Sequence, residues 1–183
     1  MDIVKHIAKH TEDLRNGFTD SSPEQRKSLV TAVLRFYFLL DDFDGIIARY
    51  INISLEKEQL IADINRENTR HYQEANEKSL AETDEYADDY EEPDPIELFV
   101  LDAFSNAVSD LNKVENIVGL LIGVIDTLDY YENFSDHPEF WNEILEKEVR
   151  FQNEISSDIK SQKIFDPMMY HERYHKIITQ HTL

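Results

Sequence analysis

The chain has 183 residues, of which 41% are hydrophobic, and it carries 38 Asp and Glu against 18 Lys and Arg. Its net charge of -20 has the same sign as nucleic acids and anionic membrane surfaces, so we expect no nucleic-acid partner and no membrane partner. The absence of cysteine excludes disulfides, thiolate metal sites and a cysteine nucleophile. The length suits one folding unit, and we expect residues 1–183 to form a single helical domain.

The composition predicts an all-α fold. There are only four Gly and five Pro, and apolar residues recur at helical spacing between them. We expect a single compact bundle of six or seven helices, with an acidic loop before a central helical hairpin. The N-terminal stretch MDIVKHIAKHTEDLRNG has acids and histidines where a signal peptide has an unbroken apolar run, so we expect a cytoplasmic location.

The first third of the chain predicts two helices separated by a defined start signal. An amphipathic helix opens the chain and ends near Gly17. Ser22, Pro23 and Gln25 then combine an N-cap serine, a proline at the first helical position and a glutamine three residues after the cap, which is a capping box. The helix that follows is apolar on most sides, and we expect it to be central and to end at the acidic cluster 41–45.

Two further helices are expected before the acidic tract. Apolar residues over 46–51 continue a helical pattern, and a longer helix is expected over 55–80. Its apolar content falls after Ile64, and a helix that is polar all round projects from the body or is poorly ordered. We therefore expect the second half of this helix to project from the body or to be poorly ordered at its end.

The acidic tract, residues 82–97, contains nine carboxylates and no base. The acidity continues beyond it, because residues 80–146 carry nineteen carboxylates and a single base, Lys113. We predict an acidic loop over 80–97 within the helical domain. A charge concentration of this kind opposes folding through self-repulsion and attracts a cationic partner.

The second half of the chain contains the clearest helix start, where Asp94 caps, Pro95 follows and Glu97 completes a capping box. A second capping sequence is expected at 112–115, before a central apolar helix in which Gly119 and Gly123 allow close approach of a neighbour. A long helix begins near Pro138, and a short one follows Pro167. The helix after Asp94 is expected to bury Leu98, Leu101, Phe104, Val108 and Leu111.

The sharpest motif for chemistry is an HExxH at 171–175, with His181 at the spacing of a third zinc ligand. On a helix His171 and His175 would share a face and could bind Zn²⁺, with Glu172 as general base. The glycine of the longer signature is replaced by Ile178, and no strand-like segment precedes the motif to align a substrate. We therefore expect no catalytic residue, no metal and no cofactor, and keep a zinc-dependent hydrolase as an alternative.

Two other groups of carboxylates have simpler interpretations. The cluster of Asp41, Asp42 and Asp44 has Gly45 where an aspartate-rich Mg²⁺ motif needs its last aspartate, so helix termination explains it better. Asp126 and Asp129 fall on one side of the central helix and are expected to form its solvent-facing stripe, which leaves a role in partner binding open.

Short motifs give a resemblance to a known family. The segment Leu101-Asp102-Ala103 and the later Phe151-Gln152-Asn153-Glu154 resemble the YjaG-like all-helical bacterial family of unknown function. That resemblance implies an all-helical fold and carries over no catalytic residue. In size, charge and class the chain is also similar to the immunity proteins that bacteria pair with secreted toxins, many of which are basic nucleases.

These observations predict an immunity or inhibitor protein that binds and occludes a basic toxin domain, and a nuclease is the expected class of toxin. Tyrosines among carboxylates suit a protein interface, because aromatic side chains supply contact area and acids pair with Arg or Lys. A helical scaffold or regulatory protein is the other alternative. The expected partner-binding residues are Asp84, Glu85, Tyr86, Asp88, Asp89, Tyr90, Glu91 and Glu92.

Overall fold

A computed structural model describes residues 3–84, 86, 90–161 and 163–181, and all the regular secondary structure in this part of the chain is helical. It contains nine helices, more than the six or seven expected, and the expectation of an all-α fold is confirmed. Their bounds are α1 Ile3–Phe18, α2 Pro23–Tyr37, α3 Phe43–Ile51, α4 Lys57–Asn65, α5 Arg70–Glu82, α6 Pro95–Val108, α7 Val114–Phe134, α8 Pro138–Ile159 and α9 Met169–His181.

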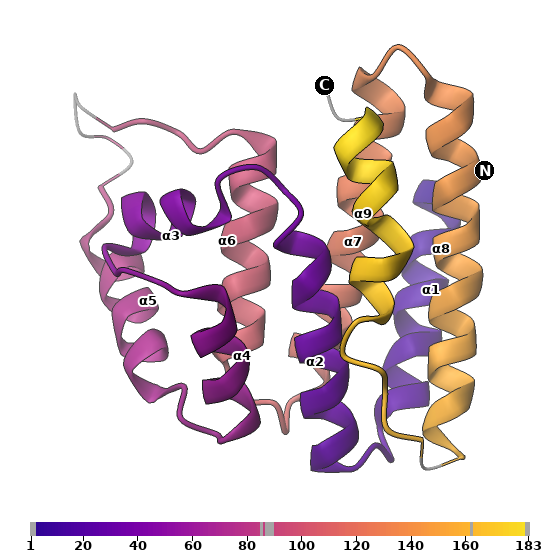
Figure 1. The fold of residues 1–183 in the computed structure, drawn as a ribbon, viewed down its shortest axis with the longest axis horizontal. Helices are drawn as coiled ribbons and strands as arrows, with labels where there is room; N and C mark the ends of the chain where they lie inside the picture. The colour runs from indigo at the N-terminus through magenta and orange to yellow at the C-terminus, as the bar shows by residue number, and fades with distance from the viewer. Residues whose placement is uncertain (1–2, 85, 87–89, 162, 182–183) are drawn as a thin grey trace.

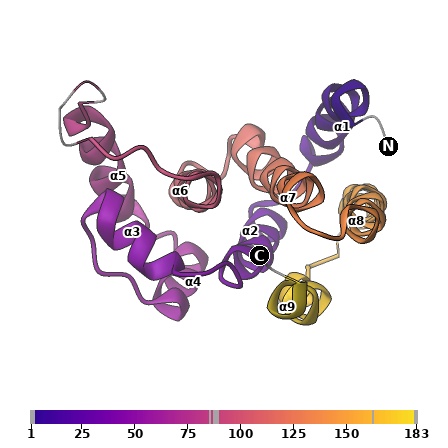
Figure 2. The same cartoon turned by 90° about the horizontal axis from the view of Figure 1, so that it is seen from above.

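The helices are arranged around a central pair, α6 and α7. Helices α1, α2, α8 and α9 gather on the α7 side, while α3, α4 and α5 lie on the other side of α6 (Figures 1 and 2). The contacts between helices agree with the two views, since α6 packs against α2, α3, α5 and α7. The buried apolar residues of all these helices form one contiguous core.

The capping boxes predicted at Ser22 and Asp94 are confirmed, whereas the capping sequence expected at 112–115 is wrong, because α7 begins after Lys113 and has no side-chain capping hydrogen bond. The Ser22 side chain accepts a hydrogen bond from the Gln25 N–H, and the Gln25 side chain accepts one from the Ser22 N–H. Asp94 and Glu97 make the same reciprocal pair at the start of α6, with both bonds at 2.9 Å. Each pair satisfies backbone donors that have no partner within the helix, which fixes where the helix begins.

The central position predicted for α7 is confirmed by the burial of Ile117, Leu121, Val124 and Leu128. Its two glycines face different neighbours. A Cβ on Gly119 would lie 2.9 Å from the side-chain amide of Asn106 on α6, and one on Gly123 would lie 2.5 Å from the hydroxyl of Tyr37 on α2. The Tyr37 hydroxyl donates a 2.8 Å hydrogen bond to the carbonyl of Leu120, so the close approach at Gly123 joins α2 to α7.

The single helix expected over 55–80 is wrong, because the chain breaks between α4 and α5. Glu67 adopts a left-handed backbone with φ 59°, and the Asn68 N–H bonds to the carbonyl of Asp63 instead of continuing the helix. The expectation that the second half projects is also wrong. Helix α5 packs against α6 through Tyr72 and Asn76, both buried, so a few well-placed side chains hold an otherwise polar helix on the body.

The bend predicted at the acidic cluster 41–45 is confirmed, since α2 ends at Tyr37 and α3 begins at Phe43. Asp42 has a left-handed backbone with φ 57°, and its side chain makes no capping hydrogen bond, so the cap expected there is absent. A Cβ on Gly45 would lie 2.2 Å from Asp42 Oδ1, which is why glycine suits the first turn of α3. No helix among the described residues combines the length and apolar content needed to cross a membrane.

Candidate functional site

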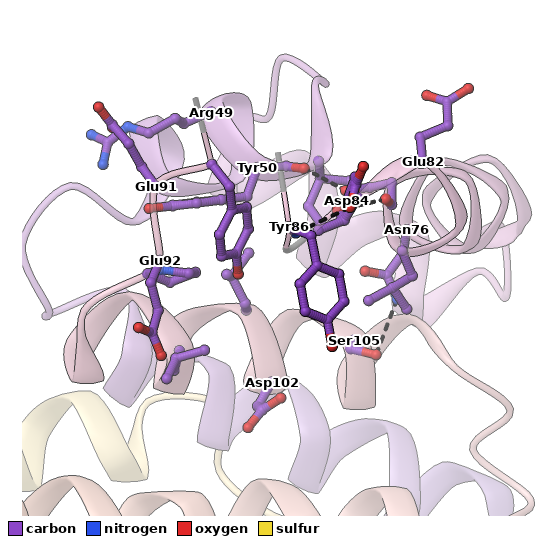
Figure 3. Close-up of a pocket in the computed structure, with 18 residues that line it drawn as sticks. Arg49, Tyr50, Asn76, Glu82, Asp84, Tyr86, Glu91, Glu92, Asp102 and Ser105 are labelled. Carbon is purple, nitrogen blue, oxygen red and sulfur yellow. Dashed lines mark hydrogen bonds between the residues drawn. The ribbon is translucent and has the colours of Figure 1, made fainter. Parts of the chain in front are cut away.

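Most of the described residues of the acidic tract, namely 82–84, 86 and 90–93, form one wall of a surface groove. The loop between α5 and α6 covers residues 83–94, shorter than the predicted 80–97, because α5 runs to Glu82 and α6 starts at Pro95. This loop faces α6, with the end of α3 at one side and α5 at the other, and encloses about 1040 Å³ (Figure 3). We call this space the acidic groove.

Five of the eight predicted partner-binding residues can be placed, and all five line the acidic groove. They are Asp84, Tyr86, Tyr90, Glu91 and Glu92. The other three, Glu85, Asp88 and Asp89, lie outside the described residues. The ring of Tyr86 projects from the loop toward α6 and Ser105 (Figure 3), and Tyr86 is 94% exposed.

The groove gathers apolar side chains that a folded protein normally buries. Six large apolar residues are notably exposed in the described part of the chain, and four of them line the groove. These four are Leu80, Tyr86, Tyr90 and Leu98. Exposed apolar side chains that cluster, instead of being scattered singly, mark an interaction surface.

Leu98 corrects a prediction, because it was expected in the core and is 44% exposed. Its predicted neighbours behave differently: Phe104 and Val108 are buried, while Leu101 and Leu111 are partly buried. The helical period placed Leu98 on the apolar side of α6, but that part of the side faces the acidic groove instead of another helix.

The charge of the groove is strongly negative. Five carboxylates line it, and Arg49 is its only guanidinium in the described lining. Arg49 is already engaged, since it pairs with Glu97 and lies 3.4 Å from Asp42 Oδ2. The five lining carboxylates belong to Glu82, Asp84, Glu91, Glu92 and Asp102.

Interactions between α3, α5 and α6 build the floor and ends of the groove. The Asn76 amide donates to Ser105 Oγ over 3.0 Å, and the Ser79 hydroxyl donates to the Tyr50 carbonyl over 2.5 Å. Burial acts to raise the pKa of Glu97, but hydrogen bonds from the Asp94 N–H and the Tyr50 hydroxyl, together with the charge of Arg49, outweigh it and lower that pKa. Glu97 is therefore charged and has a structural role, because its contacts with Asp94, Tyr50 and Arg49 leave it unavailable to a ligand.

The negative surface extends from the groove onto α7. Reduced hydration raises the pKa of Asp102, although its side chain stays exposed at the groove. Asp126 is half-buried, and its burial together with the charges of Asp129 and Asp102 raises its carboxyl pKa to about 6. These three carboxylates have no Lys or Arg partner among the described residues, so the field at the groove is not cancelled locally.

Across residues 80–146, most carboxylates with described side chains lack an ion pair to a described base. Sixteen of the nineteen are described. Only four of these form such a pair, and they are Glu82, Glu97, Glu115 and Glu143. Most of the charge of this segment is therefore not neutralised by ion pairs, and its field attracts approaching cationic molecules.

The HExxH residues do not form a metal centre with a third ligand in the described part of the chain. The rings of His171 and His175 lie 4.9 Å apart on α9, and Glu172 is exposed. No group of three or more His, Asp or Glu side chains that could hold a metal ion occurs among the described residues, and the side chain of His181 lies outside them.

Arg173 and Tyr174, within the HExxH motif, belong to a buried polar network that the sequence did not predict. Glu148 on α8 is fully buried and accepts hydrogen bonds from the hydroxyls of Tyr170 at 2.9 Å and Tyr174 at 2.5 Å. The Gln152 amide donates to Glu148 over 2.9 Å, and Arg173 Nε lies 3.5 Å from the same carboxylate. Burial raises the pKa of Glu148, and the hydrogen bonds from Tyr174, Gln152 and Tyr170 oppose this without cancelling it.

This network has a structural role. It joins α9 to α8, and Gln152 extends it to the Leu121 carbonyl at 2.8 Å and to His10 Nε2 at 2.9 Å. Helices α1, α7, α8 and α9 thus meet at one set of satisfied polar groups. Glu148, Tyr170 and Tyr174 are fully buried, so the network fixes the fold and presents no surface to a ligand.

No family model, curated protein or solved structure matches the chain. What the protein does must therefore be inferred from the acidic groove and its surroundings.

Proposed function

We propose that the protein binds a cationic protein domain through the acidic groove and blocks that domain's functional surface. In this role it is an immunity or inhibitor protein, and its partner is a basic toxin domain whose own substrate is a nucleic acid. Carboxylates of the groove and of α7 would occupy the positions where nucleic-acid phosphates bind. The long-range field would speed association, and exposed apolar side chains would slow dissociation.

One observation carries the proposal: the groove combines clustered exposed apolar side chains with five carboxylates, four of which form no ion pair with a described base. Apolar clustering alone would suit many partners, and a charged surface alone often only improves solubility. Both in one concave surface match the anatomy of a protein interface, with aromatic anchors and charges that select the partner. Tyr86 and Leu98 are such anchors on opposite walls.

The test is affinity capture from the cells that produce the protein, with wild type and two variants of equal net charge. We expect wild type and the control variant to recover the same cationic protein, and the groove variant to lose it. Equal recovery by all three would show that the groove is not the interface. The groove variant combines Glu82→Gln, Asp84→Asn, Glu91→Gln and Glu92→Gln. The control variant combines Glu12→Gln, Asp136→Asn, Glu139→Gln and Glu154→Gln, all at exposed positions outside the groove.

A further inference from the structure

We infer that the acidic groove receives a protruding segment in which basic side chains alternate with apolar ones, and that a uniformly basic surface is not its ligand. The inference rests on the proposed function, since it assumes a cationic protein partner, and it adds the chemistry of the part that enters the groove.

The shape of the groove favours a segment over a flat surface. Its volume of about 1040 Å³ is at the upper end of cavities that enclose compact ligands, which is room for a few residues of a loop or tail. The described loop residues 83, 84, 86 and 90–93 lie opposite helix α6, so an inserted segment meets side chains on both sides (Figure 3). A flat surface would contact only the rim.

The apolar side chains exclude a uniformly basic ligand. Tyr86 and Leu80 are 94% and 70% exposed, and Leu98 contributes a third apolar side chain from the α6 wall. A ligand made only of ammonium and guanidinium groups would lose hydration against these side chains without a matching gain. Apolar side chains of the ligand bury this surface instead, and the gain grows with the area covered.

The carboxylates supply the complementary half of the pattern. Glu91 and Glu92 lie on the loop wall and Asp102 on the α6 wall, and none of the three forms an ion pair with a described base. A basic side chain entering the groove therefore has a carboxylate on either side, between apolar contacts. A second copy of this chain is a poor occupant, because two molecules of net charge -20 repel each other.

Three labelled peptides of about eight residues separate the contributions: alternating Arg-Leu, alternating Arg-Gly with the same charge, and alternating Gln-Leu without charge. Binding is measured by fluorescence anisotropy at about 150 mM salt. We expect the Arg-Leu peptide to bind about tenfold more tightly than Arg-Gly, and Gln-Leu to bind more weakly than both.

Matched variants locate the contacts. The double variant Tyr86→Ala with Leu98→Ala should weaken Arg-Leu binding about tenfold and leave Arg-Gly binding unchanged. Asp102→Asn should weaken the binding of both charged peptides. The control is Phe134→Ala, which removes an exposed aromatic side chain outside the groove lining. It should change the affinity for neither charged peptide. All four positions are exposed, so these variants are expected to fold.

Each other outcome overturns a defined part. Equal affinity for Arg-Leu and Arg-Gly, unaffected by Tyr86→Ala with Leu98→Ala, would overturn this inference and leave the proposed cationic partner standing. Equal affinity for Arg-Leu and Gln-Leu would overturn both. No binding of either charged peptide overturns the inference, and the affinity capture then decides the proposed function. A dimer in sedimentation that dissociates on Tyr86→Ala with Leu98→Ala would assign the groove to a second copy.

Discussion

The Tyr50 hydroxyl donates a hydrogen bond to Glu97 Oε2 over 2.8 Å, and this contact ties the end of α3 to the first turn of α6. The same carboxylate oxygen accepts the Asp94 N–H at 2.9 Å, and the other oxygen pairs with Arg49. One glutamate thus caps α6, holds α3 and neutralises the guanidinium that lines the acidic groove. The groove keeps its negative charge because its one described guanidinium is already occupied.

Tyr50→Phe tests this junction. Removing the hydroxyl takes one donor from a charged acceptor, and we expect the free energy of unfolding to fall by about 1 kcal/mol. Urea denaturation followed by circular dichroism measures the change. Tyr130→Phe is the control, because no hydrogen bond of its hydroxyl is seen among the described residues, and it should shift stability by less than about 0.5 kcal/mol. Equal losses in the two variants would contradict the role of the Tyr50–Glu97 contact.

The capping box at Asp94 gives a second prediction. Asp94→Ala removes the acceptor for the Glu97 N–H and should cost about 1 kcal/mol in urea denaturation. Asp94→Ser keeps a capping oxygen at the same place, so it should recover most of that loss. If alanine and serine were equally destabilising, charge at the helix start would explain the effect and capping geometry would not.

The network around Glu148 predicts a larger effect. Glu148→Leu leaves the buried Tyr170 and Tyr174 hydroxyls without their acceptor, and we expect a loss of about 3 kcal/mol or more in the free energy of unfolding. The control, Glu146→Leu, changes a partly buried glutamate on the same helix that has no described hydrogen bond.

A compensating variant makes the interpretation specific. Adding Tyr170→Phe and Tyr174→Phe to Glu148→Leu removes both sides of the hydrogen bonds, which should restore part of the lost stability, because paired removal avoids unsatisfied buried groups. No recovery would indicate that Glu148 acts through packing or through Arg173 instead of through the two tyrosines.

Asp126 predicts a pH dependence of stability. Its pKa is raised from 3.8 to about 6 in the folded protein, so the folded state binds the proton more tightly than the unfolded state. The stability from the protonated form is complete below about pH 4 and is lost as the pH rises through about 6. Asp126→Asn should therefore stabilise the protein at pH 7.5 by about 1 to 2 kcal/mol, allowing for partial solvent screening, and have little effect at pH 4.

Thermal denaturation of both proteins from pH 4 to pH 8 measures this difference. Glu139→Gln, at an exposed position of the same acid-rich segment, should give a nearly constant small difference across the range. A stabilisation by Asp126→Asn that did not shrink toward pH 4 would contradict the raised pKa.

The sequence predicted the elements whose signals are local. The Ser22 and Asp94 capping boxes involve residues three apart, and their geometry follows from those residues alone. The break at Glu67 was missed because neither glycine nor proline marks it, and a left-handed glutamate has no distinct local signal. Leu98 was placed in the core because periodicity identifies an apolar side of a helix but not what covers it.

The candidate site was also predicted only in part, because the sequence signals its local features but not its tertiary contacts. Five of the eight predicted partner-binding residues line the groove, and a run of carboxylates with tyrosines in the sequence indicated them. Asp102, Leu80 and Leu98 enter the groove only through the packing of α5 and α6. The Glu148 network joins residues more than twenty positions apart. One signal was present: Glu148 and Gln152 continue the buried side of α8 between Leu145 and Ile155, at helical spacing, where polar residues need partners.

The most direct test of the central claim is the association rate of the captured cationic partner, measured by stopped flow at low and high salt. For wild type we expect the rate constant to fall at least tenfold between about 25 and 300 mM salt, because the uncompensated carboxylates steer the encounter. The variant with Glu82, Asp84, Glu91 and Glu92 neutralised should associate slowly at both concentrations. A wild-type association rate constant that does not change with salt, or a neutralised variant that associates as fast as wild type, would contradict the account.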